Sequence, residues 1–359
     1  MSDLKTNTDV AFSRQAKLFA TRYRLIALAE THFWDEWRCV LEAVGLEWRK
    51  RGYLTYVESS SEGRWGFLQI ACAHWPKPFY SSIHFEVSCN RDMVLHEEMA
   101  QVTLEVEKDI QDKEKFIHHL QGILEPYESS KLLVQTTGCV IVPNSGWRVI
   151  LGKLPLNDLS SKKIIDAINI MMPVETFVDE ALFTFPGKTI WRTSFFDNEA
   201  KAEIRWSQWN ECGATSEIGG WEQQSWGGRL DSPCLRCNGG KNNHRHGNNI
   251  LWLKSSDGYL FHNFTHGQKV YACAVVHAPR GGQLSFYIET TKEGGWRDVF
   301  NVTKDILPLD SWQLVSCEGQ IISPCDYDCT NQGLACFVIV KAPECGLKID
   351  SIEIGTIPS

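Results

Sequence analysis

The segment SSDGYLFHNFTHGQKVYACAVVHAPRGGQLSFYIET, residues 255–290, decides the fold of the C-terminal half of this sequence. Within it, every second residue is apolar from Val270 to Val276 and again from Leu284 to Ile288. A period of two places these residues on one face of a β-strand. Pro and Gly lie between the two runs, as is typical of a turn. The segment therefore predicts two neighbouring strands, each with one apolar face.

Strand-like runs of the same kind occur on both sides of this segment. Turns rich in Gly, Pro, Asn and Asp separate them. Such spacing is typical of an all-β sandwich or jelly roll, which we predict for residues 187–359. The runs are Thr189–Phe196, Asn249–Lys254, Lys269–His277, Gln283–Glu289, Trp296–Val302, Trp312–Glu318, Ala335–Lys341 and Lys348–Ile354.

The first half of the chain has a different pattern. Apolar residues recur with helical spacing over residues 12–44, 109–127 and 157–182. The order of helices and strands predicts an α+β domain over residues 1–186, with a mainly antiparallel sheet and helices on one face. The turn dipeptide Pro186-Gly187 marks the predicted boundary. The strand-like runs between the helices are Arg64–His74, Ser82–Ser88, Val102–Val106, Cys139–Val142 and Trp147–Gly152.

Composition narrows the class of protein. The chain has 359 residues, a net charge of −8 and 43% hydrophobic residues, which is typical of globular domains. The acidic balance argues against a general nucleic-acid coat, although a local basic patch stays open. No apolar run is long enough to span a membrane, and the N-terminus lacks the pattern of a secretory signal. We therefore expect a cytoplasmic protein without membrane partners, whose 13 cysteines are thiols or metal ligands.

The C-terminal half resembles the galactose-binding-like jelly rolls of carbohydrate-binding modules of families 4, 9 and 22. The resemblance is carried by residues 255–290, by DSWQLVSCEGQ (residues 310–320) and by GLKIDSIEIG (residues 346–355). It implies glycan binding. It also implies that Asp350, which matches an acidic residue before the last strand, helps to hold a structural calcium ion. Alternatively, Asp350 only begins that strand through local backbone hydrogen bonds.

The first half resembles, in pattern, the accessory region of bacterial PD-(D/E)XK-type nuclease proteins. FWDEWRCVL (residues 33–41) and Gly146-Trp147-Arg148-Val149 carry this resemblance. A nuclease centre needs an Asp followed by a strand that bears Glu-x-Lys. Glu105-Val106-Glu107-Lys108 offers the second element, but no convincing Asp strand precedes it. We therefore predict no catalytic residues and no nuclease activity through this motif.

A second candidate site is a zinc centre. Cys234 and Cys237 are followed by His244 and His246, and two thiols with two imidazoles suit a tetrahedral zinc ion. The spacing departs from that of zinc fingers, because the inner loop is short and the histidines lie two apart. The alternative is a loop with idle, reduced thiols.

The third candidate is a ligand-binding cluster of aromatic residues. Trp206, Trp209, Trp221 and Trp226 lie in one polar, glycine-rich stretch that ends at Arg229. Exposed indole rings stack on sugars or bases, and neighbouring polar groups bind hydroxyls or phosphates. The alternative is that these rings cover the end of the sandwich.

These observations favour a non-catalytic recognition protein. The jelly roll would bind a glycan, another polymer or a protein surface, and the first domain would be a platform for a protein partner. Two alternatives stay open. One is a nucleic-acid-processing enzyme or accessory subunit of a bacterial antiphage defence system. The other is a structural subunit of a phage or secretion assembly.

Overall fold

A computed structural model describes the chain in segments. These are residues 28–60, 62–76, 83–107, 110–193, 205–208, 221–237, 250–254, 267–292, 295–322, 334–340 and 346–358. The chain divides into two compact units, each made of two segments. Unit 1 comprises residues 1–117 and 138–170, and unit 2 comprises residues 118–137 and 171–359.

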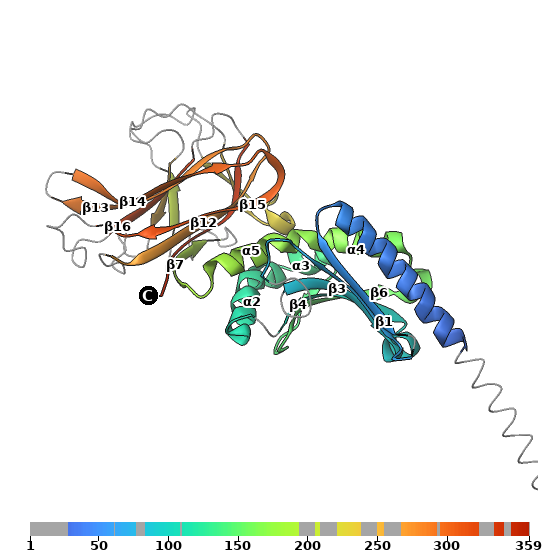
Figure 1. Ribbon diagram of the computed structural model, residues 1–359. Helices are drawn as coiled ribbons and strands as arrows, with labels where there is room; N and C mark the ends of the chain where they lie inside the picture. The colour runs from blue at the N-terminus through green and yellow to red at the C-terminus, as the bar shows by residue number, and fades with distance from the viewer. Residues whose placement is uncertain are drawn as a thin grey trace, which may run out of the picture. The chain divides into compact units, whose positions relative to one another are not determined.

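Unit 1 contains a six-stranded antiparallel sheet in the order β1-β2-β3-β4-β6-β5 (Figure 1). The apolar alternation of Ile83, Phe85 and Val87 places these buried side chains on one face of β3. The strands are β1 (Leu54–Ser60), β2 (Trp65–Ala71), β3 (Ile83–Asn90), β4 (Met99–Val106), β5 (Val140–Ile141) and β6 (Arg148–Pro155).

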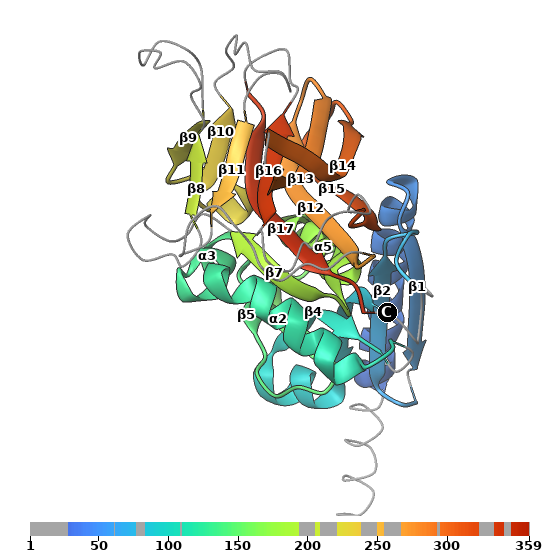
Figure 2. The same ribbon diagram turned by 90° about the vertical axis from the view of Figure 1, so that its left-hand side faces the viewer.

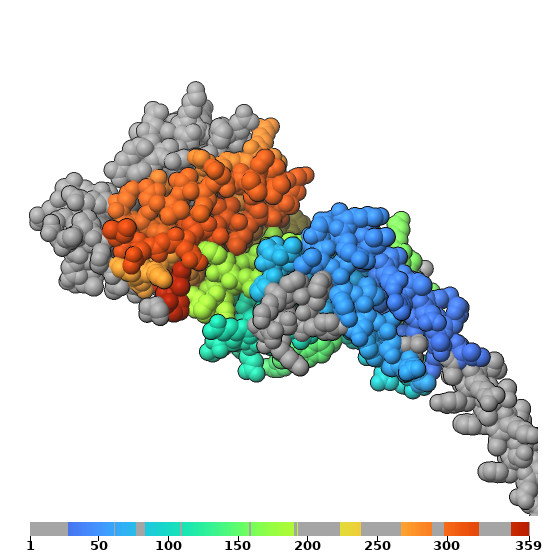
Figure 3. All heavy atoms as spheres, in the orientation of Figure 1, coloured from blue at the N-terminus to red at the C-terminus, as the bar shows by residue number. Residues whose placement is uncertain are grey.

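A helix over residues 28–50 packs on this sheet. Its buried residues recur at helical spacing and are Trp34, Trp37, Leu41, Val44 and Trp48. A Cβ atom on Gly45 would lie 3.3 Å from Leu68 of β2, so the helix backbone approaches the sheet closely here. The indole Nε1 of Trp37 donates to the carbonyl of Gly66 at 3.1 Å. Figure 3 shows the helix and β1 in blue as one continuous surface. A second helix of this half is α4 (Ser161–Met171).

Unit 2 is a β-sandwich of two antiparallel sheets. The first sandwich sheet has the order β15-β12-β17-β10-β9, with β7 also paired to β17, and the second has the order β14-β13-β16-β11-β8. The strands are β7 (Lys188–Thr193), β8 (Arg205–Gln208), β9 (Trp221–Gln224), β10 (Cys234–Cys237), β11 (Ile250–Lys254), β12 (Lys269–Ala278), β13 (Gly282–Lys292), β14 (Gly295–Ile306), β15 (Leu309–Gln320), β16 (Leu334–Val340) and β17 (Lys348–Thr356).

The core of the sandwich is formed by the alternating residues that the sequence indicated. Val270, Ala272, Ala274 and Val276 of β12 and Leu284, Phe286 and Ile288 of β13 all belong to one buried cluster. The predicted fold class, an α+β part followed by an all-β sandwich, is confirmed.

Three helices belong to unit 2 together with the sandwich (Figure 2). They are α2 (Lys113–Ser129) from His118 onward, α3 (Leu132–Thr137) and α5 (Glu175–Thr184). Phe183 of α5 makes an edge contact with the ring of Tyr271 in β12. The structural division therefore differs from the boundary predicted at Pro186-Gly187, which falls inside unit 2.

Candidate ligand face of the sandwich

The two sheets of the sandwich differ in what packs on them. On the first sandwich sheet, α5 contacts β12 and β15, and Tyr127 of α2 hydrogen-bonds to Asp350 of β17. A face covered by helices is not available to a polymer. The second sandwich sheet is therefore the candidate for a ligand face.

The outer face of the second sandwich sheet is defined by the residues that alternate with its core residues. Phe286 and Ile288 of β13 lie in the core, so Ser285 and Tyr287 lie on the opposite face. Residues paired directly across neighbouring strands share a face of the sheet. The strand register therefore assigns residues of all five strands to this outer face.

One row of the outer face is rich in aromatic residues. Tyr287 pairs with Phe337 of β16, and Phe337 pairs with Trp252 of β11. The row ends in polar residues on both edge strands, because Tyr287 also pairs with Asn301 of β14 and Trp252 with Ser207 of β8. Three aromatic positions thus lie in register across three adjacent strands.

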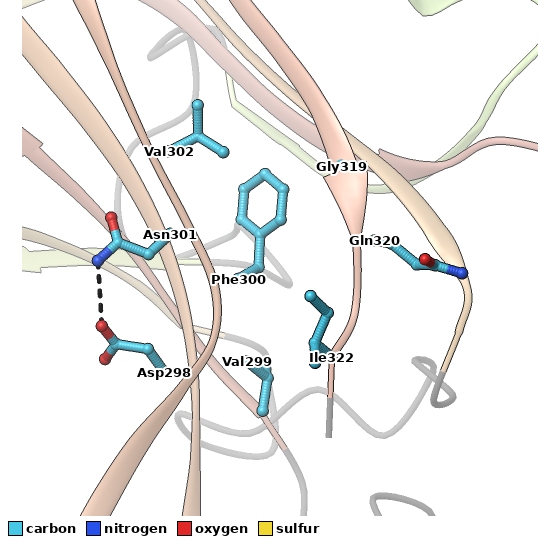
Figure 4. Close-up of a pocket in the computed structure, with 8 residues that line it drawn as sticks. All are labelled: Asp298, Val299, Phe300, Asn301, Val302, Gly319, Gln320 and Ile322. Atoms are coloured by element: carbon cyan, nitrogen blue, oxygen red, sulfur yellow. Dashed lines mark hydrogen bonds between the residues drawn. The ribbon is translucent and has the colours of Figure 1, made fainter. Parts of the chain in front are cut away.

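The polar end of this row is accessible. Asn301 is exposed, whereas Tyr287 one strand further in is only 5% exposed. The amide Nδ2 of Asn301 donates to the carboxylate of Asp298 at 3.1 Å, and Figure 4 shows both side chains on the opposite side of β14 from Phe300. One row away, the hydroxyls of Ser285 and Thr303 share a hydrogen bond of 2.7 Å. Ser285 is fully buried, so the exposed hydrogen-bonding groups of this edge are Asp298, Asn301 and Thr303 of β14.

A hollow of about 520 Å³ lies at the edge of the sandwich where β14 and β15 separate (Figure 4). Its apolar wall includes Val299, Phe300 and Ile322. A Cβ atom on Gly319 of β15 would lie 2.6 Å from the ring of Phe300, so any larger residue here would require the ring or the strand to shift. The hollow is a concave surface lined by residues of β14 and β15.

Two members of the predicted tryptophan cluster, Trp206 and Trp221, lie on strands of different sheets. Trp206 of β8 pairs with Leu253, and Leu253 shares its row with the core residue Ile288 through β16. Trp221 of β9 pairs with the core residue Cys237. Both register positions belong to the inner faces of their sheets. Trp209 lies outside the described residues.

Trp226 is the exposed member of the cluster, at 63% exposure. It lies between β9 and the short turn at Arg229–Asp231, away from the strands of the outer face. Its role in binding stays a prediction. Trp252, Tyr287 and Phe337 were not among the predicted residues. The available signal was that Tyr287 alternates with the core residues Phe286 and Ile288 in its strand.

Arg229 is fully buried and does not line a ligand surface. Its Nε donates to Asp350 at 2.7 Å and its Nη2 donates to Glu180 of α5 at 2.7 Å. Burial alone would raise the pKa of Glu180, but the guanidinium groups of Arg192 and Arg229 lower it to about 2. The guanidinium of Arg229 also lies 3.7 Å over the ring of Phe177. Arg229 is therefore a structural cation that ties α5 to the sandwich.

Asp350, the predicted calcium ligand, uses both carboxylate oxygens in this network. Oδ1 accepts from the backbone N–H of Arg229 and from the hydroxyl of Ser232. Oδ2 accepts from Arg229 Nε and from the Tyr127 hydroxyl at 2.6 Å. These donors already neutralise and solvate the carboxylate. Calcium at Asp350 stays a prediction that this arrangement does not favour.

The structure describes two of the four predicted zinc ligands, Cys234 and Cys237. Cys234 and Cys237 lie three residues apart in the extended strand β10, so they occupy opposite faces of its sheet. Cys237 packs in the core, while burial raises the pKa of the Cys234 thiol to about 11. The strand therefore does not bring both thiols to one ion. His244 and His246 lie outside the described residues.

No family model matches this chain, and no curated protein matches it. Among solved structures, a protein assigned to sugar binding from Bacteroides thetaiotaomicron is 12% identical, with a TM-score of 0.34, covering 47% of this chain and 100% of that one. The CBM22-2 xylan-binding domain of Paenibacillus barcinonensis Xyn10C is 10% identical, with a TM-score of 0.29, covering 46% and 99%.

A third similar structure is the Clostridium thermocellum xylanase 10B fragment that holds CBM22-1 and GH10 modules. It is 9% identical, with a TM-score of 0.29, and the match covers 43% of this chain and 26% of that one. Separately, none of the described helices has the length and apolar character needed to cross a membrane.

Proposed function

We propose that the β-sandwich is a non-catalytic recognition module and that the outer face of its second sheet binds a glycan. The observation that carries the proposal is the row Tyr287, Phe337 and Trp252, in register across three strands and flanked by Asn301 and Ser207.

The chemistry of this row suits a sugar polymer. Aromatic rings offer flat apolar surfaces for the C–H faces of sugar rings, and a few placed polar groups fix their orientation. Tyr287 is only 5% exposed, so in this proposal Phe337 and Trp252, on neighbouring strands about 4.8 Å apart, supply the stacking rings and the exposed Asn301 supplies a polar contact. The carboxylate of Asp298 and the amide of Asn301 provide an acceptor and a donor for hydroxyl groups.

The same face suits a glycan better than a nucleic acid. Asp298 places an anionic group at the accessible end of the row, where it would repel a phosphate backbone. In this proposal unit 1 is the platform that joins the sandwich to a protein partner, as expected from the two-part organisation of the chain.

Two tryptophans provide a matched test. Trp252 and Trp206 lie on neighbouring paired strands but at register positions on opposite faces of the sheet. The full chain should be slowed by at least one polysaccharide in an affinity gel panel that includes xylans and β-glucans. Trp252→Ala should weaken that binding by at least tenfold, because one stacked ring is worth about 1–3 kcal/mol. Trp206→Ala should retain binding and lower the melting temperature.

The opposite result would reject the outer face as the site. If Trp206→Ala loses binding while Trp252→Ala retains it at wild-type stability, the ligand lies elsewhere. If no polysaccharide in a broad panel binds, the glycan assignment fails.

A further inference from the structure

Three potential metal ligands meet on the sheet of unit 1. His84 and Glu86 lie two residues apart in β3 and so share a face, and His84 pairs directly with Glu105 of β4. The Nε2 atom of His84 lies 3.7 Å from Glu86 Oε2 and 3.9 Å from Glu105 Oε2. One ligand atom from each of the three side chains lies within 4.8 Å of the other two.

The imidazole of His84 is fully buried. Among the residues that the structure describes, neither its Nδ1 nor its Nε2 has a hydrogen-bond partner. An unsatisfied buried polar group costs about 1–3 kcal/mol, so a native fold rarely leaves one unpaired. Nε2 faces both carboxylates at distances too long for a hydrogen bond. A group that binds between these three side chains would satisfy the imidazole.

Neighbouring side chains hold the two carboxylates in place. Thr103 and Arg148 both donate to Oε1 of Glu105, at 2.8 and 3.3 Å, which leaves Oε2 directed toward His84. Gln69 donates to Glu86 at 3.3 Å. Such outer hydrogen bonds are typical of metal sites, where they orient the ligating carboxylates.

The cluster brings together two carboxylates, of Glu86 and Glu105, and Arg148 is paired with one of them at 3.3 Å. A bound cation would offset the remaining negative charge. Glu86 is 13% exposed, whereas Glu105 is 1% exposed, so Glu86 marks the side from which an ion and its waters could enter.

We propose that His84, Glu86 and Glu105 form a binding site for a divalent transition-metal ion such as Zn²⁺ or Mn²⁺. One imidazole nitrogen and two carboxylate oxygens suit such ions, with the remaining positions open to water. Two ligands bound at about 2.1 Å in tetrahedral geometry lie about 3.4 Å apart, so the two distances from His84 Nε2, 3.7 and 3.9 Å, need to close by a few tenths of an ångström.

Metal titration of the full chain tests this site. Protein stripped with a chelator is titrated separately with Zn²⁺ and Mn²⁺, and bound metal is measured. Wild type should show one more tight site than Glu86→Gln for at least one metal, because the amide keeps the shape but removes the charge. Glu97→Gln is the control, since it makes the same change at a half-exposed carboxylate paired with Lys153. It should bind as wild type does.

A second variant keeps the test valid if a buried substitution impairs folding. Thr103→Val preserves the shape of the side chain, removes one hydrogen bond to Glu105, and should weaken binding about 10–100-fold. Circular dichroism of the stripped variants checks folding. Identical isotherms for wild type and the folded cluster variants, with both metals, would overturn the proposal. Cysteine sites elsewhere contribute equally to every variant and cancel in the comparison.

Discussion

Arg229 and Asp350 lie 121 positions apart in the chain, yet the backbone N–H and the Nε of Arg229 donate to the two carboxylate oxygens of Asp350 at 2.8 and 2.7 Å. Both side chains are fully buried. Glu180 of α5 accepts from the same guanidinium, so one cation joins a turn, the last strand and a helix. The interior of unit 2 therefore depends on a polar network as well as on its apolar core.

Removal of the cation should be strongly destabilising. Arg229→Met removes the guanidinium that pairs with buried Glu180 and Asp350, and breaking such a buried pair costs about 3–5 kcal/mol, although Arg192 still pairs with Glu180. The melting temperature of the unit should fall by roughly 10 °C in a thermal scan followed by circular dichroism. Arg38→Met is the control, because its pair with Glu42 is exposed. A melting temperature equal to that of wild type would show that packing alone holds α5.

The depressed pKa of Glu180 predicts that the folded protein loses stability in acid. Its folded-state pKa of about 2 lies below the ordinary value of 4.5. The unfolded chain therefore binds the proton more readily, and stability that is present above pH 4.5 is lost as the pH falls toward 2. The shift corresponds to on the order of 3 kcal/mol. Urea unfolding across this range should show a shallower pH dependence for Glu180→Gln. An unchanged slope would mean that other carboxylates control acid unfolding.

Helix α5 should stabilise the sandwich when both are expressed as a fragment. The boundary at Pro186-Gly187 predicts that residues 187–359 fold alone into a β-rich, cooperatively melting domain. The structure adds that residues 171–359, which regain Glu180 and Phe177 as partners of Arg229, should melt at a higher temperature. Glu180→Gln in the longer fragment should remove part of the gain. Equal melting temperatures for the two fragments would show that α5 is dispensable.

The closeness of Gly319 to the ring of Phe300 predicts that substitution of this glycine destabilises the fold. Gly319→Ala forces a methyl group into the Phe300 ring and should cost about 1–3 kcal/mol. Adding Phe300→Leu should recover part of this loss, because the ring no longer occupies the space. Gly122→Ala in α2 is the contrasting control. A Cβ there meets nothing within 4 Å, so stability should rise by about 0.5–1 kcal/mol. Denaturant titration measures all four proteins.

Substitution of Cys237 distinguishes a role in core packing from a role as a zinc ligand. If it acts through its place in the core, Cys237→Ser should lower the melting temperature equally before and after chelator treatment. The exposed Cys39 provides the control Cys39→Ser, which should melt like wild type. Elemental analysis that finds about one zinc per wild-type chain, lost in Cys237→Ser, would instead support the zinc prediction.

The alternation of apolar and polar residues was the pattern from which most of the strands could be predicted. The runs around Val270 and Leu284 became core strands because one apolar face is enough to orient a strand. β1 was missed, since all seven of its residues are half-buried and it shows no alternating burial. The pattern also could not assign α2 and α5 to unit 2, because helical periodicity indicates that a face is buried but not against what.

The candidate sites were harder to predict than the strands. Sequence proximity grouped Trp206 with Trp226, whereas strand register groups Trp252 with Tyr287 and Phe337. The His84 cluster combines residues of two strands and gives no local motif. In both candidate sites, strand pairing brings together residues that are distant in the sequence. The composition of a short stretch of sequence does not show such pairing.

Each unit is built from two stretches of the chain, so the polypeptide passes from one unit to the other at residues 117–118, 137–138 and 170–171. A single proteolytic cut at any of these points leaves two further covalent links between the units. A single recombination event therefore cannot transfer the sandwich together with all the helices that pack on it. A shuffled copy would have to bring the preceding α+β sequence along or lose the helix that carries Tyr127.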